Sequence, residues 1–249
     1  MKTTKSIIAA AMLLAFGLTA LAQTNTEASR DQLLAKKIAR VLANQDRFRG
    51  INLQAEDGIV ILSGTVDLYI DKVDAEKMAR KTAGVDGIGN HIIVKTGNAS
   101  DAELLETLAN KLRYDRVGYG IMFNNLTVAA KDGEVTVAGN VRDYADRNSA
   151  LAIVETTPGV RGVVDEIDVA PLSSADDHLR ISLARSIYGH SSLQKYATDP
   201  QAPIRIVVEN GNVTLNGVVL NETDREIAFV QANAVSGVFK VDNQIVVAR

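Results

Sequence analysis

Three stretches of the chain share one pattern of hydrophobic and polar positions: residues 58–66, 133–141 and 211–219. Each begins with a glycine, continues as an alternating strand, and reaches a second glycine before a final apolar residue. An alternation of period two predicts a strand with one buried face. A glycine between two such runs predicts a hairpin turn, because glycine tolerates positive φ. The chain is therefore organised around three copies of one strand.

Further periodic segments surround the first copy of this strand. Residues 31–44 carry apolar side chains at helical spacing, with basic residues between them, and predict a helix. A short strand at 51–55 precedes the glycine strand, a second helix extends to about residue 82, and a third strand covers 87–94. Gly84 is expected to cap the second helix.

The same order of elements returns twice. The second unit repeats the first at an offset of 75 residues, and the third adds a further 78. The repeated positions include glycines that we assign to turns: Gly58, Gly64, Gly84, Gly133, Gly139, Gly159, Gly211, Gly217 and Gly237. We predict an α+β fold of three tandem αββαβ units, at 30–97, 98–171 and 172–249. Each is expected to be a three-stranded sheet covered by two helices.

The first residues have the pattern of a secretory signal peptide. Lys2 and Lys5 precede an apolar run at 7–18, and small residues follow before Gln23. We expect residues 1–22 to be removed after export, the alternative being a retained N-terminal anchor. The chain contains no cysteine, so the exported protein must be stabilised without disulfides, which a bacterial periplasm permits. The expected location is therefore the periplasm, including the surface of a membrane.

Composition argues against several classes of ligand. The formal net charge is −3, aromatic residues make up 4% of the chain, and tryptophan is absent. Nucleic-acid binding usually needs an excess of basic residues or aromatic stacking side chains, and the chain has neither. No glycine-rich loop matches a phosphate-binding motif, and no serine lies in a nucleophile elbow. We therefore expect no nucleic-acid partner and no cofactor.

The glycine strand, the order of elements and a later Gly-Val-x-Gly-Ile/Val-x-Asn/Asp element together resemble the BON (bacterial OsmY and nodulation) domain. The resemblance covers residues 30–249. Lys240 departs from it, because the first two units have Gly87 and Gly162 at this position. The resemblance implies a periplasmic or outer-membrane-associated protein that attaches to phospholipid surfaces and serves envelope integrity or osmotic stress. It also implies chaperone-like behaviour for some members, and no enzyme activity.

An aspartate recurs in each unit, at Asp71, Asp146 and Asp224. Asp143 and Asn221 are expected N-caps, so a carboxylate three residues later would accept backbone N–H bonds at the helix start. This structural role is favoured over catalysis, since one acid per unit makes no acid/base pair. The three histidines lack ligand partners at suitable spacing. No catalytic residue and no metal site is predicted.

Charge is distributed unevenly between the units. Residues 30–97 hold 11 basic and 9 acidic side chains, residues 98–171 hold 7 and 12, and residues 172–249 hold 7 and 8. The candidate lipid-binding residues of the first unit are its clustered bases: Lys36, Lys37, Arg40, Arg47, Arg49, Lys77, Arg80 and Lys81. If the two helices lie side by side, these form a basic face that attracts anionic headgroups. The alternative is a solvated helix face whose bases favour helix C-termini.

The connection at 114–125 in the second unit is apolar and contains glycines. Its candidate lipid-inserting residues are Tyr119, Ile121, Met122 and Phe123. Such a loop either enters a lipid interface, holds a partner, or folds over its own core.

Taken together, these features predict a non-enzymatic periplasmic envelope or stress protein. Its expected partner is an anionic phospholipid membrane surface, with envelope proteins as further partners. The alternative is a soluble protein-binding or chaperone-like module that uses exposed apolar patches and strand edges. An enzyme is the least favoured class, because no acid/base or nucleophile constellation is present.

Overall fold

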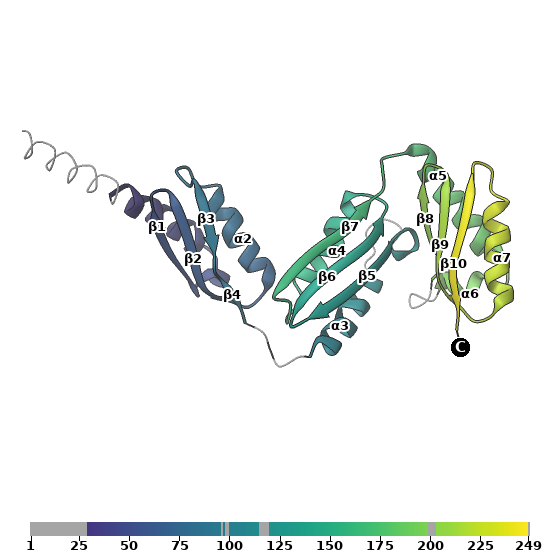
Figure 1. The fold of residues 1–249 in the computed structure, drawn as a ribbon, viewed down its shortest axis with the longest axis horizontal. Coiled ribbons are helices and arrows are strands. Elements are labelled where there is room, and N and C mark those ends of the chain that lie inside the picture. Colours follow the sequence, from purple (N-terminus) through teal and green to yellow (C-terminus); the bar gives the residue numbers. More distant parts are fainter. Residues whose placement is uncertain (1–28, 96, 98–99, 115–119, 199–202, 249) are drawn as a thin grey trace, which may run out of the picture. The chain divides into compact units, whose positions relative to one another are not determined.

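The chain divides into two compact units, Met1–Lys95 and Thr96–Arg249. The computed structural model describes residues 29–95, 97, 100–114, 120–198 and 203–248. The signal peptide expected at 1–22 lies outside these residues. The first unit contains one domain, and the second unit contains two (Figure 1).

The first unit is a single sheet with two helices. Its elements are a helix over residues 29–43, the 3-10 helix η1 (Asp46–Phe48), β1 (Ile51–Glu56), β2 (Ile59–Val66), α2 (Tyr69–Arg80), β3 (Gly87–Asn90) and β4 (Ile93–Val94). Strand β2 lies in the centre, antiparallel to β1 and parallel to β3 and β4. The hairpin makes the first pair antiparallel, and the crossover through α2 makes the second pair parallel.

The second unit repeats this arrangement in two further domains. The second domain contains α3 (Asp101–Arg113), η2 (Gly120–Phe123), β5 (Asn125–Lys131), β6 (Glu134–Val141), α4 (Tyr144–Glu155) and β7 (Gly162–Val169). The third contains α5 (Ser174–Gly189), α6 (Gln194–Thr198), β8 (Arg205–Glu209), β9 (Asn212–Val219), α7 (Glu222–Asn233) and β10 (Lys240–Val247). The strand orders are β5-β6-β7 and β10-β9-β8. The predicted α+β fold of three tandem units is confirmed.

One face of each sheet packs against the helices and the other lies open. In the first domain Val60 and Leu62 are buried on the helix side, whereas Ile59 and Ile61 point to the open side and are exposed. The buried residues of the sheet and of both helices form one hydrophobic cluster. Strand alternation therefore divides β2 into a core face and an open face, as period-two patterning requires.

The hairpin turn of each domain is held by an aspartate from the first helix. In the first domain the turn residues Asp57 and Gly58 have φ values of 50° and 76°. Both backbone N–H groups donate to the carboxylate of Asp31, at 2.9 and 3.3 Å. The same pair of bonds recurs at Asp101 and at Asp176. Sequence reasoning missed these three aspartates, although each lies near the start of the first helix of its unit.

The second glycine of each repeated strand allows a close approach of two backbones. A Cβ on Gly64 would lie 2.0 Å from the carbonyl oxygen of Gly50, and one on Gly139 would lie 2.0 Å from that of Asn125. Both glycines also have positive φ, 104° and 117°. Any side chain here would collide with the preceding segment, so the pattern requires glycine.

The prediction that Gly84 caps the second helix is wrong in detail. Helix α2 ends at Arg80 and its C-cap is Lys81, which keeps right-handed φ and ψ. Gly84 has a φ of 98° and lies three residues beyond the cap, in the turn that leads to β3. The backbone first makes a tight turn, with Thr82 N–H bonded to Ala79 O and Val85 N–H to Thr82 O. The left-handed residue is therefore needed later than at the helix end.

The recurring aspartates Asp71, Asp146 and Asp224 are buried at the third position of the second helix of each domain. Asp143 and Asn221 are the N-caps in the second and third domains, as expected, and Leu68 is the N-cap in the first. Each buried carboxylate pairs with a cation: Arg47 at 3.0 Å, Arg142 at 3.2 Å and Lys195 at 2.7 Å. The pairing neutralises a buried charge, so the structural interpretation fits the geometry.

The second and third domains are joined by side chains that cross between them. Phe123, in η2, is 3% exposed and belongs to the hydrophobic cluster of the third domain, with Met122 packed against it. Arg205 of β8 donates from Nη1 to Asn125 Oδ1 at 3.1 Å and to Leu126 O at 3.4 Å. These contacts explain why the two domains form one compact unit.

Candidate functional site

The N-terminal helix of the first domain presents a basic outer face. Leu34, Ile38 and Leu42 point into the core and are nearly fully buried. Helical geometry places Lys36 and Arg40 on the opposite side, and both are exposed. Lys37 is also exposed. The predicted helix thus carries these three bases in solvent.

Helix α2 adds a second group of bases. Its buried side is formed by Asp71, Ala75 and Ala79, so Lys77 and Arg80 face outward. Lys81 follows as the exposed C-cap. Both helices belong to one hydrophobic cluster and therefore cover the same sheet face. We call the following residues the basic helix face: Lys36, Lys37, Arg40, Lys77, Arg80 and Lys81.

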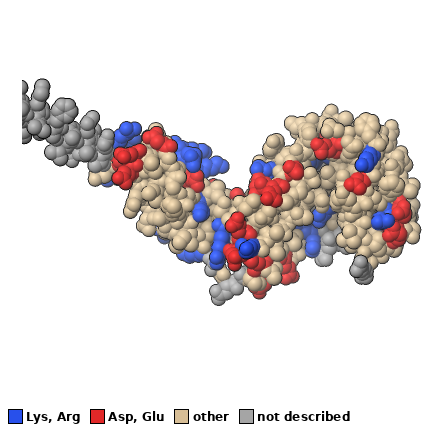
Figure 2. Space-filling model, viewed as in Figure 1, with Lys and Arg blue, Asp and Glu red and all other residues tan. Residues whose placement is uncertain are grey.

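Most charges of the basic helix face are uncompensated. Arg80 pairs with Glu76 at 2.7 Å. Among the residues that the structure describes, the other members form no ion pair. Leu33, on the outer side of the N-terminal helix, is 60% exposed. Groups of Lys and Arg are visible at the surface of the N-terminal domain, beside Asp and Glu (Figure 2).

Two further predicted bases, Arg47 and Arg49, are engaged within the domain. Arg47 binds Asp71 at 3.0 Å and Asp74 at 2.9 Å, and its guanidinium lies 4.6 Å from the centre of the Phe48 ring. Burial alone would lower the pKa of Arg47, but the two carboxylates outweigh it and raise the pKa above its ordinary value. Arg49 pairs with Asp46 at 2.7 Å. The structure therefore gives Arg47 a stabilising role in the fold, apart from the basic helix face.

The predicted loop residues of the second domain have different surroundings. Tyr119 lies outside the described residues, and Ile121 lies in η2. Met122 is half-buried and Phe123 is buried against the core of the third domain. Lipid contact through Phe123 would require this side chain to leave that core.

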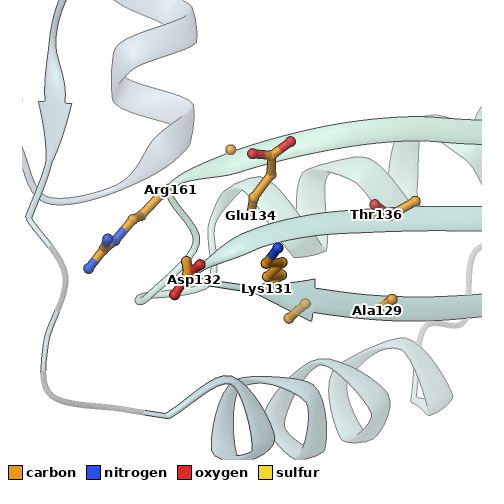
Figure 3. A pocket seen from close by; sticks show the side chains of 8 residues that line it. Ala129, Lys131, Asp132, Glu134, Thr136 and Arg161 are labelled. Atoms are coloured by element: carbon orange, nitrogen blue, oxygen red, sulfur yellow. The ribbon is translucent and has the colours of Figure 1, made fainter.

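A shallow groove runs over the end of the hairpin in both the first and the second domain. In the second domain it measures ≈ 610 Å³, and Figure 3 shows Glu134 and Thr136 on β6 with Lys131 on the neighbouring strand. The equivalent groove of the first domain measures ≈ 500 Å³ and has Ile59 and Ile61 at the corresponding positions. The same place in the repeat is therefore polar in one domain and apolar in the other.

The residues that the structure describes contain neither a candidate metal site nor a candidate membrane-spanning helix. No group of three His, Asp or Glu side chains in these ranges could hold a metal ion. None of the helices that the structure describes is long and apolar enough to cross a membrane.

Comparison with known proteins identifies the repeated unit. Residues 30–96, 100–171 and 190–249 match the BON domain. The chain is 23% identical over 146 residues to the osmotically-inducible protein Y of Escherichia coli (strain K12), covering 55% of this chain and 71% of that protein. It is 24% identical over 140 residues to an uncharacterized protein in the gshII 5′ region of Anaplasma centrale, covering 55% of this chain and 93% of that one.

Similarity to solved structures is low. The C-terminal domain of CdsD, a structural protein of the type III secretion system of Chlamydia trachomatis, is 12% identical with a TM-score of 0.24. That alignment covers 85% of this chain and 96% of the CdsD chain.

Proposed function

The chain belongs to the BON domain family, and from this premise we propose a non-enzymatic protein of the bacterial envelope that binds anionic phospholipid surfaces through its first domain. The N-terminal pattern of a signal peptide supports export to the periplasm. The similarity to an osmotically-inducible protein supports a role in envelope stress.

One observation carries the lipid proposal: the uncompensated bases of the basic helix face. A Lys or Arg near an anionic membrane surface is attracted by about 1 kcal/mol. Several such residues on one rigid pair of helices would add their attractions, while Leu33 offers an apolar side chain for shallow contact. The expected binding is modest and weakens with salt, because exposed charges are screened over about 8–10 Å.

The alternative, a solvated helix face, accounts for only part of this charge. Lys77, Arg80 and Lys81 lie at the C-terminal end of α2, where any helix favours a cation. Lys36 and Lys37 lie in the middle of the helix at 29–43, where the helix dipole gives no such preference. The helix dipole therefore does not account for these two lysines, and the lipid proposal gives them a role.

Co-sedimentation with liposomes tests the proposal. Residues 23–249 would be mixed with vesicles rich in phosphatidylglycerol or made of phosphatidylcholine alone, at low and high salt. The proposal expects pelleting with the anionic vesicles only, and less of it at high salt. Equal pelleting with both vesicles, or none with either, would contradict it.

A further inference from the structure

Strand β1 is an unpaired edge of the first sheet. Over the described part of the chain it pairs with β2 alone. The groove of ≈ 500 Å³ follows this edge, with Gln54 and Glu56 of β1, Ile59 and Ile61 of β2, and Asp31 and Ala35 of the N-terminal helix among its walls. An edge strand with a groove beside it has backbone donors and acceptors available to a further strand.

The open side of this groove is apolar in a place where a sheet normally presents polar residues. Ile59 is 52% exposed and Ile61 is 40% exposed. Their neighbours on β3 are Gly87 and Gly89, which have no side chains, although the His91 ring lies over Gly89 beside Ile61. The exposed flanks of both isoleucines are therefore available for contact with apolar side chains.

The edge also has few of the residues that usually protect an edge strand from pairing, since Glu56 at its end is its one charged residue. Strand β1 reads Ile-Asn-Leu-Gln-Ala-Glu and contains neither lysine nor proline. Its counterpart in the second domain, β5, ends on Lys131. Its counterpart in the third domain, β8, is contacted by η2, whose Phe123 is buried in the cluster of that domain. In the third domain, therefore, an apolar segment of the neighbouring domain packs against this strand, although it does not pair with it as a strand.

The charge of the groove indicates which kind of segment would bind there. Among the described residues that line it, Asp31 and Glu56 are the charged ones, and both are acidic. A second copy of the chain, paired antiparallel along β1, would place Glu56 opposite the uncharged start of the other β1 and leave the acidic charge of the groove unmatched. An extended segment with apolar side chains and a nearby Lys or Arg would complement both features of the groove.

We propose that the groove along β1 binds an extended apolar segment of another protein, carrying a basic residue, which adds to the sheet as a further strand. Backbone pairing with β1 supplies affinity, contact with Ile59 and Ile61 supplies apolar burial, and Asp31 and Glu56 select the basic residue. This site uses the strand edge and the open face of the sheet, whereas the lipid proposal uses the outer face of the helices. The two proposals can therefore succeed or fail separately.

Peptide binding to the full exported chain tests the proposal. The probe is a fluorescent peptide that alternates valine and threonine and has one central lysine; its companion has glutamate at the centre. Fluorescence anisotropy is expected to show binding of the lysine peptide and weaker binding of the glutamate peptide. Ile61→Lys is expected to weaken binding of the lysine peptide by at least about tenfold, through lost apolar contact and added repulsion.

Two matched variants control for general effects of added charge. Thr136→Lys introduces a lysine at the equivalent position of the second domain, and Ile93→Lys replaces an isoleucine by lysine on the same sheet but outside the groove. Both should bind the lysine peptide like the unmodified chain, with circular dichroism confirming that all variants fold.

Three results would overturn the proposal. Equal binding of the two peptides would remove the role of the acidic residues, and unchanged binding by Ile61→Lys would move the site elsewhere. A concentration-dependent dimer in sedimentation velocity, abolished by Ile61→Lys, would identify a second copy as the occupant instead.

Discussion

The first and second domains share one scaffold but use one repeated aromatic residue in opposite ways. Phe48 and Phe123 occupy the same position at the repeat offset of 75 residues. Phe48 is buried in the core of its own domain, whereas Phe123 is buried in the core of the third domain. The first domain therefore completes its own core, while the third domain depends on a side chain from its neighbour.

This difference shows how tandem copies diverge without losing their fold. The glycines that the backbone conformation requires, such as Gly64 and Gly139, are repeated, and each allows the same close approach of two backbones in its domain. The residues around them are free to change, so the first domain carries the basic helix face and an apolar groove. The second domain carries a polar groove and a link to the third.

Truncation of the two phenylalanines should have the largest effect and should destabilise a different domain in each case. Phe48→Ala and Phe123→Ala each remove a buried aromatic side chain and are expected to cost about 3–5 kcal/mol of stability. Hydrogen exchange followed by mass spectrometry would locate the loss. Phe48→Ala should increase exchange only within the first domain, and Phe123→Ala should increase it in the third domain.

Tyr114→Ala provides a control for the second of these variants, because this aromatic side chain is exposed just before the same connection. It should leave exchange in the third domain unchanged. Protection of the third domain that survived Phe123→Ala would contradict the idea that its core is completed by the second domain.

Alanine at the repeated strand glycines should have a smaller effect, of equal size in both domains. Gly64→Ala and Gly139→Ala place a Cβ 2.0 Å from a backbone oxygen at positive φ. Relief of this clash requires backbone movement, with an expected loss of about 2–3 kcal/mol. Thermal unfolding monitored by circular dichroism would measure it. Gly97→Ala is the control, because a Cβ at Gly97 meets nothing within 4 Å.

Acid should lower the stability of the third domain through Asp224, by less than the phenylalanine or the glycine substitutions do. Burial alone would raise the pKa of Asp224, but hydrogen bonds from Lys195 and Tyr196 outweigh it and hold the pKa below its ordinary value. A carboxylate whose pKa is lower in the folded state than in the unfolded state stabilises the fold at pH values above the unfolded-state pKa. This stabilisation is lost as the pH falls through the folded-state pKa. The loss is expected below about pH 4.

Chemical denaturation at pH values from neutral to acid would measure this dependence. Asp224→Asn should lower stability at neutral pH and reduce the further loss in acid. If unfolding of the third domain depended on acid equally in Asp224→Asn and in the unmodified chain, Asp224 would not be the cause of that dependence.

Much of the fold follows from local patterns that the repeat makes visible three times. The repeated glycine pattern predicts the strands β2, β6 and β9. The N-caps Asp143 and Asn221 are predicted because each lies three residues before an aspartate. These features depend on residues close in sequence, where turn geometry and capping act. The fold class was predictable for the same reason.

Contacts between distant residues could not be predicted in this way. Asp71 pairs with Arg47 of η1 and Asp224 pairs with Lys195 of α6, both of which lie more than 20 residues away in sequence. Asp146 differs, because its partner Arg142 is only four residues before it. The burial of Phe123 depends on how the third domain packs beside the second. A sequence offset identifies equivalent positions but does not say which core a side chain enters.

The most direct test of the lipid account is a comparison of two triple charge reversals in the full exported chain. One changes Lys36, Lys37 and Arg40 to glutamate. The other changes the exposed residues Lys131, Arg185 and Lys240 to glutamate, which lowers the net charge equally outside the first domain. The account predicts that the first triple weakens binding to phosphatidylglycerol vesicles at least about tenfold while the second has little effect. Equal weakening by both, or by neither, would contradict the assignment of lipid binding to the basic helix face.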